Sequence, residues 1–116
     1  MKREFLDYVD DIIEAMTNAA AFVEGMKYED FARDIKTTYA VVRSLEIVGE
    51  AVKRIPDSVR SRYPQIPWRD MAGMRNKLIH EYFGVKLKVV WETIKNDIPA
   101  LKPLFDKILE DFEDKS

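Results

Sequence analysis

The sequence contains no cysteine and only one histidine, His80. Without cysteine, disulfides, thiolate catalysis and cysteine-based zinc sites are excluded. One histidine among scattered carboxylates makes a catalytic metal site improbable, so we predict neither a metal nor a cofactor. Glycine and proline are also scarce, with 4 and 5 residues, and no glycine-rich phosphate-binding loop is present.

Long apolar runs are missing as well. No stretch approaches the roughly 20 apolar residues that cross a bilayer, and the first residues do not resemble a signal peptide. We therefore expect a cytoplasmic protein with no membrane partner. The 116 residues, 47% hydrophobic and 34% charged, predict one globular domain spanning residues 1–116.

The apolar residues recur at helical spacing, and no segment alternates as a strand would. The pattern predicts an all-α fold, an antiparallel bundle of four to five helices. The expected helices span residues 4–25, 28–55, 57–62, 67–84 and 86 onward, with a break at 97–99 caused by Pro99. Asp57 or Ser58 is expected to cap the short helix. The second helix should bury one stripe of residues: Phe31, Ile35, Tyr39, Val42, Leu45, Val48, Gly49 and Val52.

Charge is unevenly distributed. The net charge is −2, yet residues 53–77 hold seven lysines and arginines against Asp57 and Asp70, a balance of +5. Such a block can bind an anion such as a phosphate backbone. It can equally be a solvated basic region that pairs with the acidic C-terminal tail.

Arg75 and His80 lie on the same predicted helix. At 100° per residue they are about 140° apart, with Arg75 inside an apolar arc and His80 beside Asn76. An unpaired buried arginine would cost several kcal/mol. Arg75 must therefore meet a carboxylate, for which Glu46 and Glu50 are the candidates, or an anion in a cleft.

An arginine with a histidine suffices in kind for metal-free RNA cleavage. Histidine exchanges protons near neutral pH, and the arginine cation stabilises charge on a phosphate. Full acid–base catalysis would need a second imidazole, which a symmetric dimer would supply. A lone histidine on a helix can also be purely structural, and Trp68 and Trp91 are expected as core or dimer anchors.

The stretch Arg75-Asn76-Lys77-Leu78-Ile79-His80-Glu81-Tyr82 has the form Arg-x4-His-x-Tyr. It resembles the HepT family of the HEPN superfamily. The likeness extends over nearly the whole chain, through Arg43-Ser44-Leu45-Glu46-Ile47-Val48-Gly49-Glu50-Ala51, Tyr63-Pro64-Gln65-Ile66-Pro67-Trp68, Gly73-Met74 and Phe83-Gly84-Val85 to Val90-Trp91. One departure is Lys86, where the family commonly has an acidic residue.

The resemblance implies a HEPN-like helical bundle that forms a two-fold homodimer. It implies a metal-independent endoribonuclease toxin, with RNA as substrate, Arg75 and His80 catalytic and Asn76 as the supporting polar residue. It also implies a partner, an MNT-type nucleotidyltransferase antitoxin that transfers AMP to the tyrosine of the motif, Tyr82. The added phosphate would block RNA by bulk and charge.

Two other interpretations stay open from the sequence. The chain can be a non-catalytic dimerisation module that binds a nucleotidyltransferase, or a bundle that binds nucleotides without cutting RNA. The intact Arg-Asn-x3-His-x-Tyr pattern favours the ribonuclease.

Overall fold

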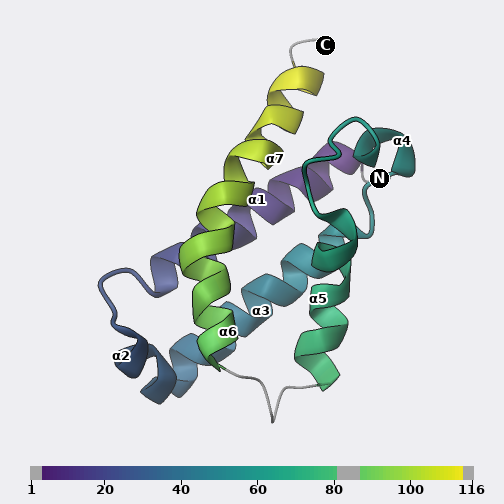
Figure 1. Cartoon of the computed structure of the whole chain (residues 1–116). Coiled ribbons are helices and arrows are strands. Elements are labelled where there is room, and N and C mark those ends of the chain that lie inside the picture. The colour runs from purple at the N-terminus through teal and green to yellow at the C-terminus, as the bar shows by residue number, and fades with distance from the viewer. Residues whose placement is uncertain (1–3, 81–86, 114–116) are drawn as a thin grey trace.

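The computed structural model describes residues 4–80 and 87–113. Within these two ranges every regular element is helical and there is no strand (Figure 1). The all-α prediction is therefore confirmed for the described part of the chain. In the same ranges, no helix combines the length and the apolar character that crossing a membrane requires.

The first helix, α1 (Phe5–Phe22), begins where Asp7 accepts a hydrogen bond from the backbone N–H of Glu4 at 3.2 Å. Its inward face follows the predicted spacing, with Val9, Ile12, Ala15, Met16 and Ala19 buried. The chain turns at Gly25, whose φ of +77° is favourable only for glycine. The predicted first helix is thus confirmed, three residues shorter at its C-terminal end.

The segment predicted as one helix over residues 28–55 is two helices, α2 (Tyr28–Arg33) and α3 (Ile35–Val52). Asp34 separates them with an extended backbone (φ −94°, ψ 93°). Its carboxylate accepts hydrogen bonds from the backbone N–H of Thr37 at 3.1 Å and from the Thr37 hydroxyl at 2.8 Å. This is an N-cap, which starts a new helix.

The predicted apolar stripe is correct except at the start of α3. Phe31, Val42, Leu45, Val48 and Val52 are buried. By contrast, Ile35 is 70% exposed and Tyr39 is 60% exposed, so their assignment to the core was wrong. Because the helix is interrupted at Asp34, α3 does not continue the direction of α2. Ile35 and Tyr39, in the first turns of α3, lie on its solvent-facing side.

The short helix α4 (Asp57–Arg60) follows Pro56, which occupies the N-cap position without a side-chain cap. The expectation that Asp57 or Ser58 caps it was therefore wrong. Arg60 instead caps the end of α3. Its guanidinium donates to the carbonyls of Ile55 (2.8 Å), Val52 (3.2 Å) and Lys53 (3.3 Å), where α3 has unsatisfied acceptors.

The last part of the chain contains α5 (Trp68–His80), α6 (Leu87–Glu92), a π-helical turn η1 (Thr93–Asp97) and α7 (Ile98–Glu113). The break predicted at 97–99 is displaced: the irregular turn is η1, at 93–97, where the Ile98 N–H bonds to the Thr93 carbonyl five residues back, and Pro99 lies within α7. Buried Val90, Ile94 and Ile98 follow steps of four. On an ideal α-helix two such steps drift by about 80°, and the wider turn corrects this drift.

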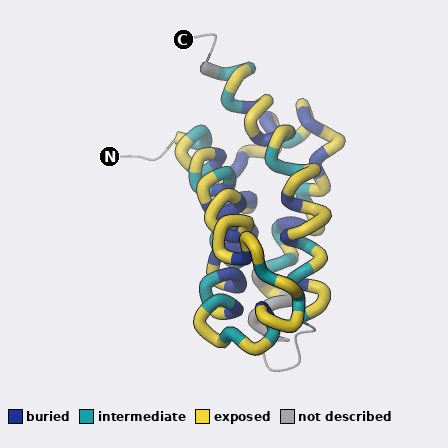
Figure 2. Tube along the Cα trace, turned by 90° about the vertical axis from the view of Figure 1, so that its left-hand side faces the viewer, coloured by how far each residue is buried: buried dark blue, intermediate teal, exposed yellow. Residues whose placement is uncertain are grey.

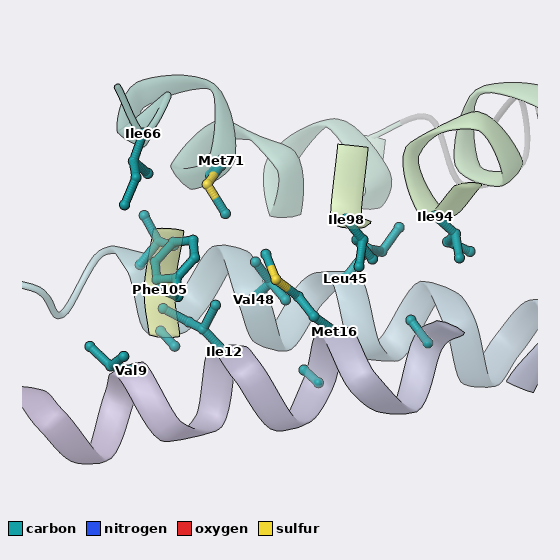
Figure 3. Packing of buried hydrophobic residues seen from close by; sticks show 14 of the residues in the cluster. Val9, Ile12, Met16, Leu45, Val48, Ile66, Met71, Ile94, Ile98 and Phe105 are labelled. Atoms are coloured by element: carbon teal, nitrogen blue, oxygen red, sulfur yellow. The ribbon is translucent and has the colours of Figure 1, made fainter. Parts of the chain in front are cut away.

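The helices pack around one core. α3 contacts both α1 and α5, and α7 runs along α1. Figure 3 shows side chains from α1, α3, α5 and the last segment meeting there, and Figure 2 shows buried positions on the inward faces. The described chain has four long helical segments, counting α6, η1 and α7 as one, with α2 and α4 as short additions.

Candidate functional site

Helix α5 positions the sequence motif. It is fixed at its start by Trp68, whose Nε1–H donates to the carbonyls of Tyr63 (3.0 Å) and Arg60 (3.1 Å). The Trp68 ring also packs edge-on against the buried ring of Phe105, with centroids 5.6 Å apart. Asp70 in the first turn favours the helix start electrostatically.

The faces of α5 agree with the helical wheel where side chains are described. Met71 is buried, Met74 packs against the core, and Asn76 is exposed. Arg75 and His80 belong to the helical backbone of α5. Their side chains, and all of Tyr82 and Lys86, lie outside the described residues.

The backbone places Arg75 one helical turn beyond Met71. Figure 3 shows Met71 near Val48 of α3, with Leu45 further along α3 in the direction that α5 takes. α3 and α5 are thus antiparallel neighbours.

A shallow groove of about 400 Å³ lies between α1 and α3. Glu46 and Glu50, the two predicted partners of Arg75, both line it and are half-buried. The remaining lining residues are Tyr8, Asp11, Arg43, Ile47, Ala51 and Arg54. The groove is strongly polar, with three carboxylates between two arginines.

Glu50 forms an ion pair with Arg54, with Oε1 3.6 Å from Nη2. Both side chains are about half exposed, so this pair contributes at most a fraction of a kcal/mol. Sequence reasoning found Glu46 and Glu50 but missed Tyr8 and Asp11. These two come from α1, and periodicity within one helix gives no information about which residues of another helix lie opposite.

The basic segment 53–77 is partly used for structure. Arg60 caps α3, and the Arg62 guanidinium lies 4.7 Å from the centroid of the Phe112 ring. These contacts favour a structural role for these two arginines over phosphate binding. Among residues 4–80 and 87–113, no cluster of three or more histidine or acidic side chains has a geometry suited to a metal ion.

Comparison with known proteins decides the family. The model of the Ribonuclease HepT-like family matches residues 12–108. The chain belongs to the HepT-like ribonuclease family. The matched range includes α5, which carries the motif, and most of the helices that build the core.

Curated relatives agree with this assignment. The chain is 52% identical over 108 residues to "Probable ribonuclease HepT" of Thermococcus cleftensis, covering 93% of this chain and 98% of the relative. It is 49% identical over 114 residues to "Putative RNase MJ1216" of Methanocaldococcus jannaschii, covering 98% of this chain and 94% of the relative. No solved structure gives a significant match.

Proposed function

We propose that this chain is a metal-independent endoribonuclease toxin of the HepT type, acting as a two-fold dimer. Its membership of the HepT-like ribonuclease family carries the proposal. The placement of Arg75, Asn76 and His80 on the single helix α5 supports it. Arg75 and His80 are the catalytic pair, and Asn76 assists His80.

The proposed reaction needs no external reagent. His80 takes the proton of a ribose 2′-hydroxyl, and the 2′-oxygen forms a bond to the adjacent phosphorus. The bond between phosphorus and the 5′-oxygen breaks, and that oxygen takes a proton from an imidazolium. Arg75 stabilises the negative charge on the phosphate oxygens. The products are a 2′,3′-cyclic phosphate and a 5′-hydroxyl.

Arg75 and His80 are about 140° apart on an ideal helix. One RNA phosphate can therefore meet both groups only at the edge of a groove or between two copies. A second copy would also supply the second imidazole for proton donation. We further propose that Glu46 or Glu50 holds the Arg75 guanidinium, because both lie on α3, the helix that contacts α5.

The nuclease proposal is tested with purified protein and RNA in the presence of a chelator. Wild type should cut RNA, while Arg75→Ala and His80→Ala should each lose about 10²-fold or more, the usual contribution of one catalytic group. Arg69→Ala is the matched control, because Arg69 is exposed on the first turn of the same helix. Full cleavage by His80→Ala would refute the catalytic assignment.

The toxin proposal includes inactivation by a nucleotidyltransferase antitoxin that AMPylates Tyr82. Intact mass after incubation with such a partner and ATP should increase by one or more adenylyl groups. Tyr82→Phe should stay unmodified, and expression of the partner should relieve growth arrest by the wild type. Adenylyl groups that persist on the Tyr82→Phe variant would show that another residue is the acceptor.

A further inference from the structure

An aromatic cluster joins α2 to α6. The ring of Trp91 lies 5.3 Å from that of Phe31 and 6.0 Å from that of Tyr28, measured between centroids. Phe31 is fully buried, whereas Tyr28 and Trp91 are only half-buried. The cluster is therefore fixed to the core through Phe31 and presents part of two rings to solvent.

Two lysines cover these rings. The Lys88 Nζ lies 4.5 Å from the centroid of Tyr28, and the Lys95 Nζ lies 4.8 Å from the centroid of Trp91. Both lysines are exposed. We call Tyr28, Lys88, Trp91 and Lys95 the lysine–aromatic patch. Lysine stems often shield apolar surface in this way, and the ammonium groups remain available to an anion.

The position of the patch connects it to the motif. Figure 1 shows α2 and α6 at the same end of the bundle as the last turn of α5, which carries His80. Lys95 belongs to the π-helical turn η1. π-helical turns occur frequently at functional sites. The spacing of the buried residues Val90, Ile94 and Ile98 also favours a π-helical turn here.

Carboxylates are also close in sequence. Glu29 and Asp30 belong to α2, Glu92 ends α6, and Asp97 ends η1. Asp30 is engaged at the start of α2, where it accepts a hydrogen bond from the Lys27 backbone N–H at 3.1 Å. Counted with Lys27 and Arg33, the two lysines of the patch give four positive charges against these four carboxylates, so the formal charge is about zero. A ligand would be held by local contacts of the two ammonium groups and rings, and not by a long-range field.

We propose that the lysine–aromatic patch binds single-stranded RNA that extends from the cleavage site. Lys88 and Lys95 contact phosphates, and a base stacks on the ring area that the flexible lysine stems uncover. RNA fits this patch better than a protein partner. A partly exposed ring can stack on a base, and the lysine beside that ring can contact the phosphate of the same nucleotide. This inference rests on the proposed ribonuclease function and adds a substrate contact outside the motif.

The test measures binding of a fluorescent single-stranded RNA made uncleavable by 2′-O-methyl groups. The variant Lys88→Met with Lys95→Met removes both charges but keeps the stems over the rings. Its Kd should be about tenfold or more weaker than that of wild type. The slope of log Kd against log salt should fall by roughly 1.4, the value for two phosphate contacts on a single strand.

The matched control is Lys102→Met with Lys107→Met, which removes two charges from α7, outside the basic segment 53–77. This variant should bind like wild type. A double variant of Lys88 and Lys95 with wild-type Kd and salt slope would overturn the proposal that the patch binds RNA. If the wild type still cuts ordinary RNA, the ribonuclease proposal would stand. Wild-type protein that neither binds nor cuts RNA would overturn both proposals.

Discussion

At the scale of single residues, Tyr63 and Asp111 form the most informative long-range contact. The Tyr63 hydroxyl donates to Asp111 Oδ2 at 2.7 Å, and Lys107 Nζ lies 3.1 Å from Oδ1. Burial and then the bond to Asp111 raise the pKa of Tyr63 to about 12. The bond from Tyr63 and then that from Lys107 lower the pKa of Asp111. The contact ties the end of α7 to the loop before α5.

This contact predicts a difference in alkaline stability. Because the pKa of Tyr63 is raised above its ordinary value of 10.0, the contact stabilises the fold fully below about pH 10 and is lost as pH rises through about 12. Tyr63→Phe should have a lower melting temperature than wild type at neutral pH. That difference should shrink above about pH 10, as measured by thermal unfolding followed by circular dichroism.

Tyr8→Phe is the control for this measurement, because Tyr8 is a half-buried tyrosine on α1 that lines the groove, whereas the donor to Asp111 is Tyr63. Its difference from wild type should not follow the same alkaline course. Parallel melting curves of wild type and Tyr63→Phe across the whole pH range would contradict the stabilising role of the Tyr63 hydroxyl.

The sequence predicted individual residues well where one helix decides their environment. Met71 on the core side and Asn76 on the exposed side of α5 follow from periodicity alone. The sequence did not predict contacts between residues of different helices. Asp11 in the groove and Asp111 beside Tyr63 depend on how helices cross, and helix spacing in the sequence does not contain that information. The positions of the Arg75, His80 and Tyr82 side chains stay predictions.

At the scale of elements, the break between α2 and α3 has the clearest cause. Asp34 could be accommodated within a continuous helix, and the apolar spacing runs through it, so periodicity predicted no break. The two hydrogen bonds that its carboxylate accepts from Thr37 favour a new helix start. The same preference explains why Ile35 and Tyr39, predicted in the core, lie exposed.

Asp34→Ala should therefore destabilise the protein, because α3 loses the group that caps its N-terminus. The hydrogen bonds from Thr37, first that from its hydroxyl, lower the pKa of Asp34. The cap thus contributes stability above about pH 4, the ordinary range of aspartate, and loses it as pH falls through the lower folded-state pKa. Urea unfolding should show the deficit of the variant at pH 7 and a smaller one in acid.

Asp57→Ala is the matched control for this change. Asp57 also lies in the first turn of a helix, but its side chain is fully exposed and meets Arg60 only at 4.0 Å. Its removal should leave the urea midpoint nearly unchanged. Equal effects of the two substitutions would show that capping by Asp34 is not what stabilises α3.

At the scale of the whole molecule, the contacts that anchor α5 and the residues proposed for chemistry lie at opposite ends of the bundle. One end holds α4, the cap by Arg60 and the start of α5, where Trp68 fixes the helix. The other end holds α2, α6 and the last turn of α5 with His80 (Figure 1). The residues proposed for chemistry thus lie far from the contacts that anchor their helix.

The proposed two-fold dimer is tested on the intact chain. Light scattering at micromolar concentration should give a mass of twice 13.6 kDa, because a shared cleft needs two copies for its second imidazole. His80→Ala should give the same mass while losing cleavage. A fully active protein with the mass of one chain would remove the argument for paired histidines.

The two tryptophans occupy opposite ends of this bundle. Trp68 packs against Phe105 at the anchoring end, and Trp91 packs against Phe31 at the end with the motif. Each can therefore serve as a separate optical probe. In a Trp91→Phe chain the remaining fluorescence follows the integrity of the core, and in a Trp68→Phe chain it follows events at the end where RNA is proposed to bind. Trp68 fluorescence thus reports unfolding of the core, and Trp91 fluorescence reports binding of the proposed RNA ligand.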